Sequence, residues 1–228
     1  ARRSRPAARL SQIGPKFLTH RPDASDLSAI RRDMQGVYER QAGVWHRHRM
    51  RDLNERKWLD PFLASLPLRP RVLDLGCGSG VPLGAFLLAQ GCDLTGVDYS
   101  GAMIALAREH APSGNWQVQD MRALDLVGNF DGIVSWDAFL HLSQDEQLQL
   151  LPILGRLVRP GGALLLTVGP GGGEVTGMVG GEAVYHASLD PEEYRRQLEA
   201  LGFKDIAFTP EDPEVMGRSV LLATGKGG

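Results

Sequence analysis

Residues 71–80 constrain the fold more than any other stretch, because they join a short apolar run to three closely spaced glycines: Arg-Val-Leu-Asp-Leu-Gly-Cys-Gly-Ser-Gly. The aliphatic residues of Arg71–Leu75 predict a buried parallel strand, since such runs bounded by a glycine turn are typical of one. The chain that follows predicts a helix, with Pro82 near its first turn and Gly91 just past its end. A strand, a tight turn and a helix N-terminus bring backbone N–H groups against a polar ligand.

Two ligands suit this turn, a dinucleotide and S-adenosylmethionine. The dinucleotide fingerprint Gly-x-Gly-x-x-Gly would start at Gly76 and require a glycine where the chain has Val81. The turn instead resembles motif I of the class I S-adenosylmethionine-dependent methyltransferases, in which an acidic residue precedes Gly-x-Gly-x-Gly by two positions. In the alternative interpretation, the glycines only make a turn. The resemblance implies that the cofactor binds at Asp74, Gly76, Cys77, Gly78, Ser79 and Gly80.

A second strand is predicted over Asp93–Asp98, and it ends on a carboxylate. An ionised carboxylate can accept hydrogen bonds from both ribose hydroxyls, so Asp98 is a candidate for binding the ribose. A dinucleotide site would place an acid similarly, so this feature indicates an adenosine ligand of either kind. Tyr99 can pack on the adenine, and Ser100 is expected to cap the next helix. The string Gly-Val-Asp-Tyr-Ser with Met103 resembles motif II of the same family, which implies that Met103 also lies at the cofactor.

The third expected strand, Trp116–Gln119, stops at Asp120 and Met121. Adenine offers an amine donor and ring-nitrogen acceptors, which a carboxylate followed by a free backbone N–H can match. Asp120 and the amide of Met121 therefore resemble the adenine clamp of the family. The alternative is that Asp120 is only a turn residue at a strand end.

The fourth expected strand, Phe130–Trp136, ends next to the first, at the switch point where ligands bind in open α/β sheets. The resemblance implies that Trp136 and Asp137 line the sulfonium and methionine part of the cofactor. His141 and Asp137 are candidate catalytic residues, although an isolated histidine more often serves packing. The chain lacks the Pro-Pro-aromatic sequence of relatives that methylate amino groups of DNA or protein. It also lacks the Asp-Asn pair of metal-dependent relatives, so no metal is expected.

Residues 169–181 contain seven glycines and predict a mobile loop at the same edge of the sheet. Tyr185 and His186 follow, ahead of a helix that Asp190 and Pro191 should open. A Tyr–His pair beside a loop could orient and deprotonate a hydroxyl or amine, so both residues are candidate catalytic groups. The alternative is a surface or packing histidine.

The N-terminal part predicts a basic tail over residues 1–22 and a helical cap over residues 23–69, before the main domain at 70–228. The tail could be disordered, an arm for nucleic acid or an organelle presequence. In the cap, Tyr38 and Trp45 could cover the sulfonium, since aromatic faces attract cations; ordinary core packing is the alternative. Arg47, Arg49 and Arg51 are candidates for binding an acidic group of the acceptor.

Two strands are predicted near the C-terminus, Phe203–Phe208 and Ser219–Ala223, separated by about ten residues without a helical pattern. A parallel crossover generally needs a longer, helical connection, so the last strand should run antiparallel. That end is the methyltransferase variant of the Rossmann architecture. We therefore expect an α/β fold with a mostly parallel, Rossmann-like seven-stranded sheet, an antiparallel last strand, helices on both faces and an N-terminal helical cap.

Composition limits the partners. The net charge is −2 over 228 residues, so there is no basic field for nucleic acid or for an anionic membrane. No apolar run reaches the ~20 residues of a membrane span. Two cysteines occur and suggest neither a metal site nor a disulfide framework, which favours a cytoplasmic location, or an organellar one if the basic tail is a presequence.

Together these features predict a methyltransferase that uses S-adenosyl-L-methionine, releases S-adenosyl-L-homocysteine and methylates O, N or C of a small molecule, as a monomer or homodimer. Two alternatives remain open. One is a subunit that binds S-adenosylmethionine without catalysis, and the other is a nicotinamide-dependent dehydrogenase.

Overall fold

The computed structural model describes residues 24–49, 52–126 and 128–228. The expectations for the basic tail and for Arg51 lie outside the described residues. The helices are α1 (Ala24–His48), α2 (Arg56–Ala64), α3 (Leu83–Ala89), α4 (Gly101–His110), α5 (Gln144–Leu157) and α6 (Pro191–Ala200), with short 3-10 turns η1 (Met121–Ala123), η2 (Phe139–His141) and η3 (Pro213–Val215). The strands are β1 (Arg71–Leu75), β2 (Asp93–Asp98), β3 (Asn115–Val118), β4 (Phe130–Ser135), β5 (Val158–Val168), β6 (Gly173–Val179), β7 (Glu182–Ser188), β8 (Asp205–Asp212) and β9 (Arg218–Thr224).

The central sheet has seven strands in the order β3-β2-β1-β4-β5-β9-β8. The pairs from β3 to β5 are parallel, whereas β9 runs antiparallel to both β5 and β8. This confirms the predicted fold class, including the antiparallel last strand. β1 lies between β2 and β4, and its residues from Val72 to Leu75 are buried, as the continuous apolar run of a central parallel strand requires.

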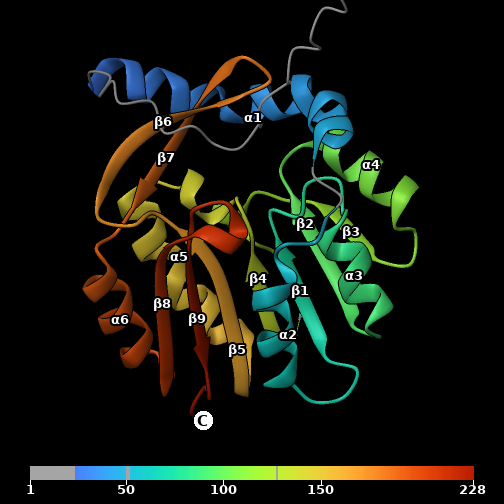
Figure 1. Ribbon diagram of the computed structural model, residues 1–228, viewed down its shortest axis with the longest axis vertical. Coiled ribbons are helices and arrows are strands. Elements are labelled where there is room, and N and C mark those ends of the chain that lie inside the picture. Colours follow the sequence, from blue (N-terminus) through green and yellow to red (C-terminus); the bar gives the residue numbers. More distant parts are fainter. Residues whose placement is uncertain (1–23, 50–51, 127) are drawn as a thin grey trace, which may run out of the picture.

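Helices cover both faces of this sheet (Figure 1). One apolar cluster joins the sheet to α2, α3 and α4, and a second joins its other face to α5 and α6. α2 packs closely because β4 carries Gly132 beneath it, where a Cβ would come 2.5 Å from the Phe62 ring. The segment expected as one helical cap therefore divides: α2 lies on a face of the sheet, and α1 lies elsewhere.

α1 packs against a separate two-stranded antiparallel sheet formed by β6 and β7 (Figure 1). Leu27, Met34 and Val37 of α1 form an apolar cluster with residues of this hairpin. The mobile loop expected over residues 169–181 is wrong, because seven of these residues form β6. Gly180 and Gly181, at φ 57° and 89°, make the turn of the hairpin, where positive φ values suit the twist of the paired strands.

β5 has an irregular start at Val158. Val158 already pairs with Phe130 of β4, and the register then shifts before Gly132 pairs with Ala163. Gly161 and Gly162 lie in this irregular part of the strand. The part of the chain that the structure describes contains no helix both long and apolar enough to cross a membrane.

Candidate active site

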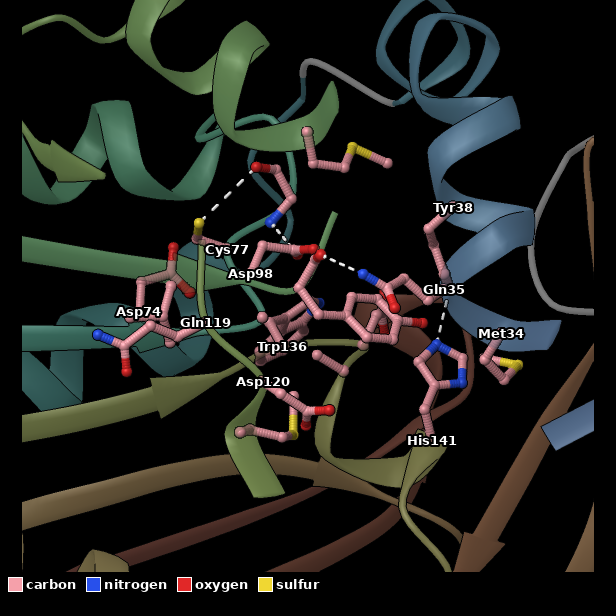
Figure 2. Close-up of a pocket in the computed structure, with 18 of the residues that line it drawn as sticks. Met34, Gln35, Tyr38, Asp74, Cys77, Asp98, Gln119, Asp120, Trp136 and His141 are labelled. Atoms are coloured by element: carbon pink, nitrogen blue, oxygen red, sulfur yellow. Dashed lines mark hydrogen bonds between the residues drawn. The ribbon is translucent and has the colours of Figure 1, made fainter. Parts of the chain in front are cut away.

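A cavity of about 310 Å³ lies at the carboxyl ends of β1, β2 and β4, with α1 along its other side (Figure 2). Most of the residues that the sequence motifs single out line this cavity, although they come from segments more than a hundred positions apart. These residues are Tyr38, Trp45, Asp74, Gly76, Cys77, Gly78, Ser79, Asp98, Tyr99, Met103, Asp120, Met121, Trp136, Asp137 and His141.

The glycine turn is held against β2 by backbone hydrogen bonds. The N–H groups of Gly76 and Cys77 both donate to the carbonyl of Val97, at 2.8 and 3.0 Å. Gly76 has φ 78°, and a Cβ there would lie 2.2 Å from the Cβ of Ala138. Only glycine fits such a position, where the backbone is left-handed and the neighbouring loop is in contact.

Gly80 is not among the residues that line the cavity, and its assignment as a cofactor-binding residue stays a prediction. Its N–H donates to the carbonyl of Cys77 at 3.0 Å and closes the turn. A Cβ at this position would lie 3.1 Å from both Ala107 and the ring of Trp116. The physical role of Gly80 is therefore close packing between the turn and α4.

Asp98 ends β2 at the centre of the cavity (Figure 2). Its Oδ2 accepts from the N–H of Gly78, and its Oδ1 accepts from the N–H of Ser100, both at 2.9 Å. Burial raises its pKa to about 6, against the effect of these hydrogen bonds. Each carboxylate oxygen keeps a second lone pair, so the rigidly held side chain can still accept two hydroxyl hydrogens from a ligand.

Glu39 of α1 supports this site, although the sequence analysis did not identify it. Its carboxylate accepts from the hydroxyl of Ser100 at 2.6 Å and from the N–H of Ala102 at 3.1 Å. A carboxylate at the first turn of α4 also stabilises the positive end of the helix dipole. No local pattern announces this contact, because the two segments are 61 residues apart.

Asp74 is 3% exposed and lines the same cavity. Its pKa is raised to about 7 by burial and by the charge of Asp98, while the charge of Arg49 acts in the opposite direction. A cation that approaches such a carboxyl group stabilises its ionised form. Nearby, the indole N–H of Trp136 and the hydroxyl of Ser79 are buried and have no hydrogen-bond partner among the described residues.

Asp120 and Met121 lie on the side of the cavity expected to hold adenine. The carboxylate of Asp120 accepts from the backbone N–H and the guanidinium of Arg122, with the shortest contact at 2.5 Å. Burial acts to raise the pKa of Asp120, but the hydrogen bonds from Arg122 lower it overall. Arg122 also lies 3.6 Å from Glu146, which pairs with Arg31 of α1 at 2.8 Å. Ionic contacts thus join α1 to this side of the cavity.

Asp137 follows β4 in a left-handed conformation, with φ 57°. Its two carboxylate oxygens accept from Nε and Nη2 of Arg218 at 2.6 and 2.7 Å, and its N–H donates to Thr167 at 2.7 Å. Burial alone would raise the pKa of Asp137, but the charge of Arg218 lowers it overall. A carboxylate held in this way is a poor proton acceptor and a good fixed charge. Arg218 was missed by sequence reasoning, because it lies 81 residues away at the start of β9.

Tyr38, His141 and the backbone of Tyr185 form a chain of hydrogen bonds at the edge of the cavity. Nδ1 of His141 lies 2.8 Å from the carbonyl oxygen of Tyr185, which can only accept, so Nδ1 carries the hydrogen. Burial lowers the pKa of His141, which keeps the ring neutral. Its Nε2 is then an acceptor, and the hydroxyl of Tyr38 donates to it at 2.7 Å (Figure 2).

The expected catalytic pair of Tyr185 and His186 is separated by the structure. Adjacent residues of a strand point to opposite faces, and both lie in β7. The Tyr185 hydroxyl donates to Glu174 at 2.6 Å, and its side chain lines neither cavity described here. The His186 ring lies 4.9 Å from the His141 ring, and burial lowers its pKa to about 3. Of this pair, only His186 stays at the site.

A second cavity, of about 100 Å³, adjoins the first, and His186 lines this second cavity. Five residues line both cavities and form the partition between them: Tyr38, Trp45, Arg49, Asp137 and His141. The rest of the smaller cavity comes largely from apolar residues of β5 and the β6–β7 hairpin. A ligand in each cavity would therefore contact the same five residues. The described residues contain no group of three or more His, Cys, Asp or Glu side chains that could hold a metal ion.

The parallel strands β3 to β5, the antiparallel β9 and the glycine turn between β1 and α3 define the fold of the class I S-adenosylmethionine-dependent methyltransferases. Residues 72–162 match the family of methyltransferase domains, and the chain carries such a domain.

Comparisons with individual proteins agree with this assignment. The chain is 33% identical over 116 residues to malonyl-(acyl-carrier protein) O-methyltransferase of Enterobacter lignolyticus, a match that covers 50% of this chain and 45% of that protein. The chain thus spans about half the length of this curated relative. Two solved structures share the fold at 22% identity. The 1,6-didemethyltoxoflavin-N1-methyltransferase of Burkholderia thailandensis has a TM-score of 0.64 and covers 94% of this chain and 95% of its own. An amino pentose methyltransferase from Micromonospora echinaspora has a TM-score of 0.63, with 81% and 95% covered.

Proposed function

We propose that this protein transfers a methyl group from S-adenosylmethionine to O, N or C of a small-molecule acceptor. The observation that carries the proposal is the pair of adjoining cavities, which share a wall formed by Tyr38, Trp45, Arg49, Asp137 and His141. The larger cavity has the acidic groups and the glycine turn of an adenosyl-ligand site, and the smaller one has room for an acceptor. Methyltransferase names among the relatives support the same activity.

The residues of the larger cavity match the chemical groups of S-adenosylmethionine. Asp98 would accept the ribose hydroxyls, and the raised pKa of Asp74 marks a carboxyl group that a cation would keep ionised. Trp136 and Ser79 offer the buried donors noted above for a ligand carboxylate. Tyr38 and Trp45, whose rings meet edge to face at 6.2 Å, provide aromatic surface for a sulfonium. When bound, this cofactor supplies a methyl group that is already activated for displacement by an acceptor's lone pair.

The protein's own contribution is then to align the two ligands, to exclude water from their reacting atoms and to accept a proton. The partition residues bring the two ligands together in a largely buried space, which excludes water from the reacting atoms. Nε2 of His141 holds a lone pair at this partition, and an acceptor hydroxyl could replace Tyr38 as its donor. Asp137, ion-paired with Arg218, would hold a fixed negative charge beside the reacting centre.

The proposal is tested by calorimetry followed by methyl-label transfer. S-adenosylmethionine and S-adenosylhomocysteine should each bind at micromolar concentrations, and labelled methyl groups should enter a small-molecule fraction of a metabolite extract. Binding without any transfer would favour the non-catalytic alternative. Failure of both ligands to bind while a nicotinamide coenzyme binds would contradict the proposal.

The affinity for S-adenosylmethionine should rise about tenfold between pH 6 and pH 8. Burial raises the pKa of Asp74 to about 7, so this group costs stability progressively as the pH rises from about 4 to about 7 in the free protein. A cationic ligand favours the ionised form and binds better once the proton has left. Asp98, with a pKa of about 6, adds a smaller change in the same direction.

The measurement is calorimetry at pH 6, 7 and 8, with Asp74→Asn as the matched variant. This variant retains Asp98 and should keep only a small increase in affinity over the same range. An equal increase in both proteins would show that Asp74 is not the titrating group.

A further inference from the structure

We propose that the smaller cavity selects an uncharged acceptor group, no larger than a six-membered ring with its nucleophilic substituent, and that the ion pair between Arg218 and Asp137 sets this selectivity. The inference rests on the proposed function, because it concerns the acceptor of that same reaction. It replaces the expectation that arginines near Trp45 bind an acidic acceptor.

Arg218 is the cation most deeply placed in the smaller cavity, with 9% of its side chain exposed. Two of its nitrogens donate to the two oxygens of Asp137, and the third donates to the carbonyl of Val215 at 2.9 Å. An arginine recognises a carboxylate or phosphate through two parallel donors, and here both already hold a carboxylate. Arg218 therefore cannot offer this pairing to an anionic acceptor without giving up Asp137.

Asp137 stays ionised but is already paired with Arg218, so it gives a cationic acceptor no free counter-charge. It is the single carboxylate among the described residues that line the smaller cavity. An ammonium group would have to share it with the guanidinium of Arg218, which lies 2.6 Å away. Charge repulsion and desolvation would then both oppose its binding.

Arg49, at the partition, is compensated in the same way. Its guanidinium donates to Glu55, and the exposed fractions of the two side chains are 12% and 5%. Arg47 is exposed and lines neither cavity. The buried charges at the smaller cavity are therefore paired within the protein, so an acceptor that added a charge would leave one uncompensated.

The remaining surface of the smaller cavity suits an uncharged ring. Leu140, Val168, Met178, Val179 and Val184 supply apolar surface. The cavity is partly open, and its volume of about 100 Å³ is below the ~150 Å³ of a closed cavity known to hold benzene. A single ring therefore reaches out through the opening, and two fused rings exceed the space.

His141 and His186 line the same space, and burial keeps both imidazoles neutral. Neutral imidazoles can accept a hydrogen from an uncharged nucleophile. His48, on the exposed side, is the remaining histidine that lines the cavity.

The experiment uses the protein saturated with S-adenosylhomocysteine and four probes: benzyl alcohol, benzoate, benzylammonium and 2-naphthalenemethanol. Saturation is first verified by calorimetry, so failure of the cofactor product to bind would count against the proposed function and not against this inference. Ligand-observed NMR titrations then measure the four dissociation constants. Benzyl alcohol should bind at least tenfold more tightly than the two charged probes, and the naphthalene probe should not bind measurably.

A charge variant adds a second readout. Asp137→Asn leaves Arg218 without its carboxylate, so the ratio of benzoate to benzyl alcohol affinity should rise at least tenfold. Removing one partner of a buried pair can unfold a protein, so the double variant Asp137→Asn with Arg218→Gln serves as the uncharged companion. It should lose the tenfold rise in relative benzoate affinity, because no unpaired guanidinium remains.

The wild-type titrations test the inference even if the single variant does not fold. Equal binding of the three small probes, tighter binding of benzoate, binding of the naphthalene probe or no binding of benzyl alcohol would each overturn the inference.

Discussion

A Gly76→Ala variant should lose about 2–5 kcal/mol of unfolding free energy, whereas Gly91→Ala should lose about 1–2 kcal/mol. Both glycines have left-handed backbones, with φ 78° and 84°. A Cβ at Gly91 would meet nothing within 4 Å, but at Gly76 it would lie 2.2 Å from the Cβ of Ala138. Gly91→Ala thus measures the backbone strain alone, and the difference between the variants measures the cost of separating the turn from the loop after β4.

Urea unfolding of the two variants and the wild type gives these free energies. The Gly76→Ala protein should also lose S-adenosylhomocysteine binding wherever it remains folded, because Ala138 and Gly76 both line the larger cavity. Equal losses in the two variants would show that the loop after β4 moves aside easily. The close contact would then not be what holds the cavity in shape.

Much of the fold could be predicted from short stretches of sequence. Consecutive residues signal each of three features: the glycine turn, the carboxylate ending β2 and the end of β4. In each case an apolar run is followed by residues suited to a turn. In a parallel sheet the carboxyl ends of these strands lie at one edge, so the local patterns also determine which side chains meet. The sequence therefore predicts that Asp74, Asp98 and Trp136 lie close together, and all three line the larger cavity.

The parts that escaped prediction depend on pairings between distant segments. Residues 169–181 predict a loop although they contain β6, because their glycines dilute the alternating pattern of a strand. Arg218 and Glu39 act through partners 81 and 61 residues away, and no spacing in the sequence signals such contacts. Tyr185 and His186 were paired because they are adjacent, although adjacency in a strand places side chains on opposite faces.

Asp98→Asn should weaken S-adenosylhomocysteine binding at least a hundredfold, while changing the unfolding free energy much less. The asparagine has one acceptor oxygen, so it cannot accept from both the Gly78 and the Ser100 N–H groups as the carboxylate does at 2.9 Å. It would also lose the charge-assisted bonds that the proposed function assigns to the ribose, worth about 1.5–3 kcal/mol each, of which two account for a hundredfold loss or more.

Stability is expected to respond differently because burial raises the pKa of Asp98 to about 6. The folded-state pKa lies above the unfolded value, so the ionised carboxylate is a net cost to folding above pH 6, and its removal offsets the lost hydrogen bonds. Calorimetry and urea unfolding at pH 8 measure the two quantities, with Asp93→Asn as the control. Asp93 begins the same strand, is 70% exposed and contacts Arg71 at 3.4 Å. If Asp98→Asn kept wild-type affinity, or if the control lost as much, the carboxylate at the end of β2 would not be the group that holds the ligand.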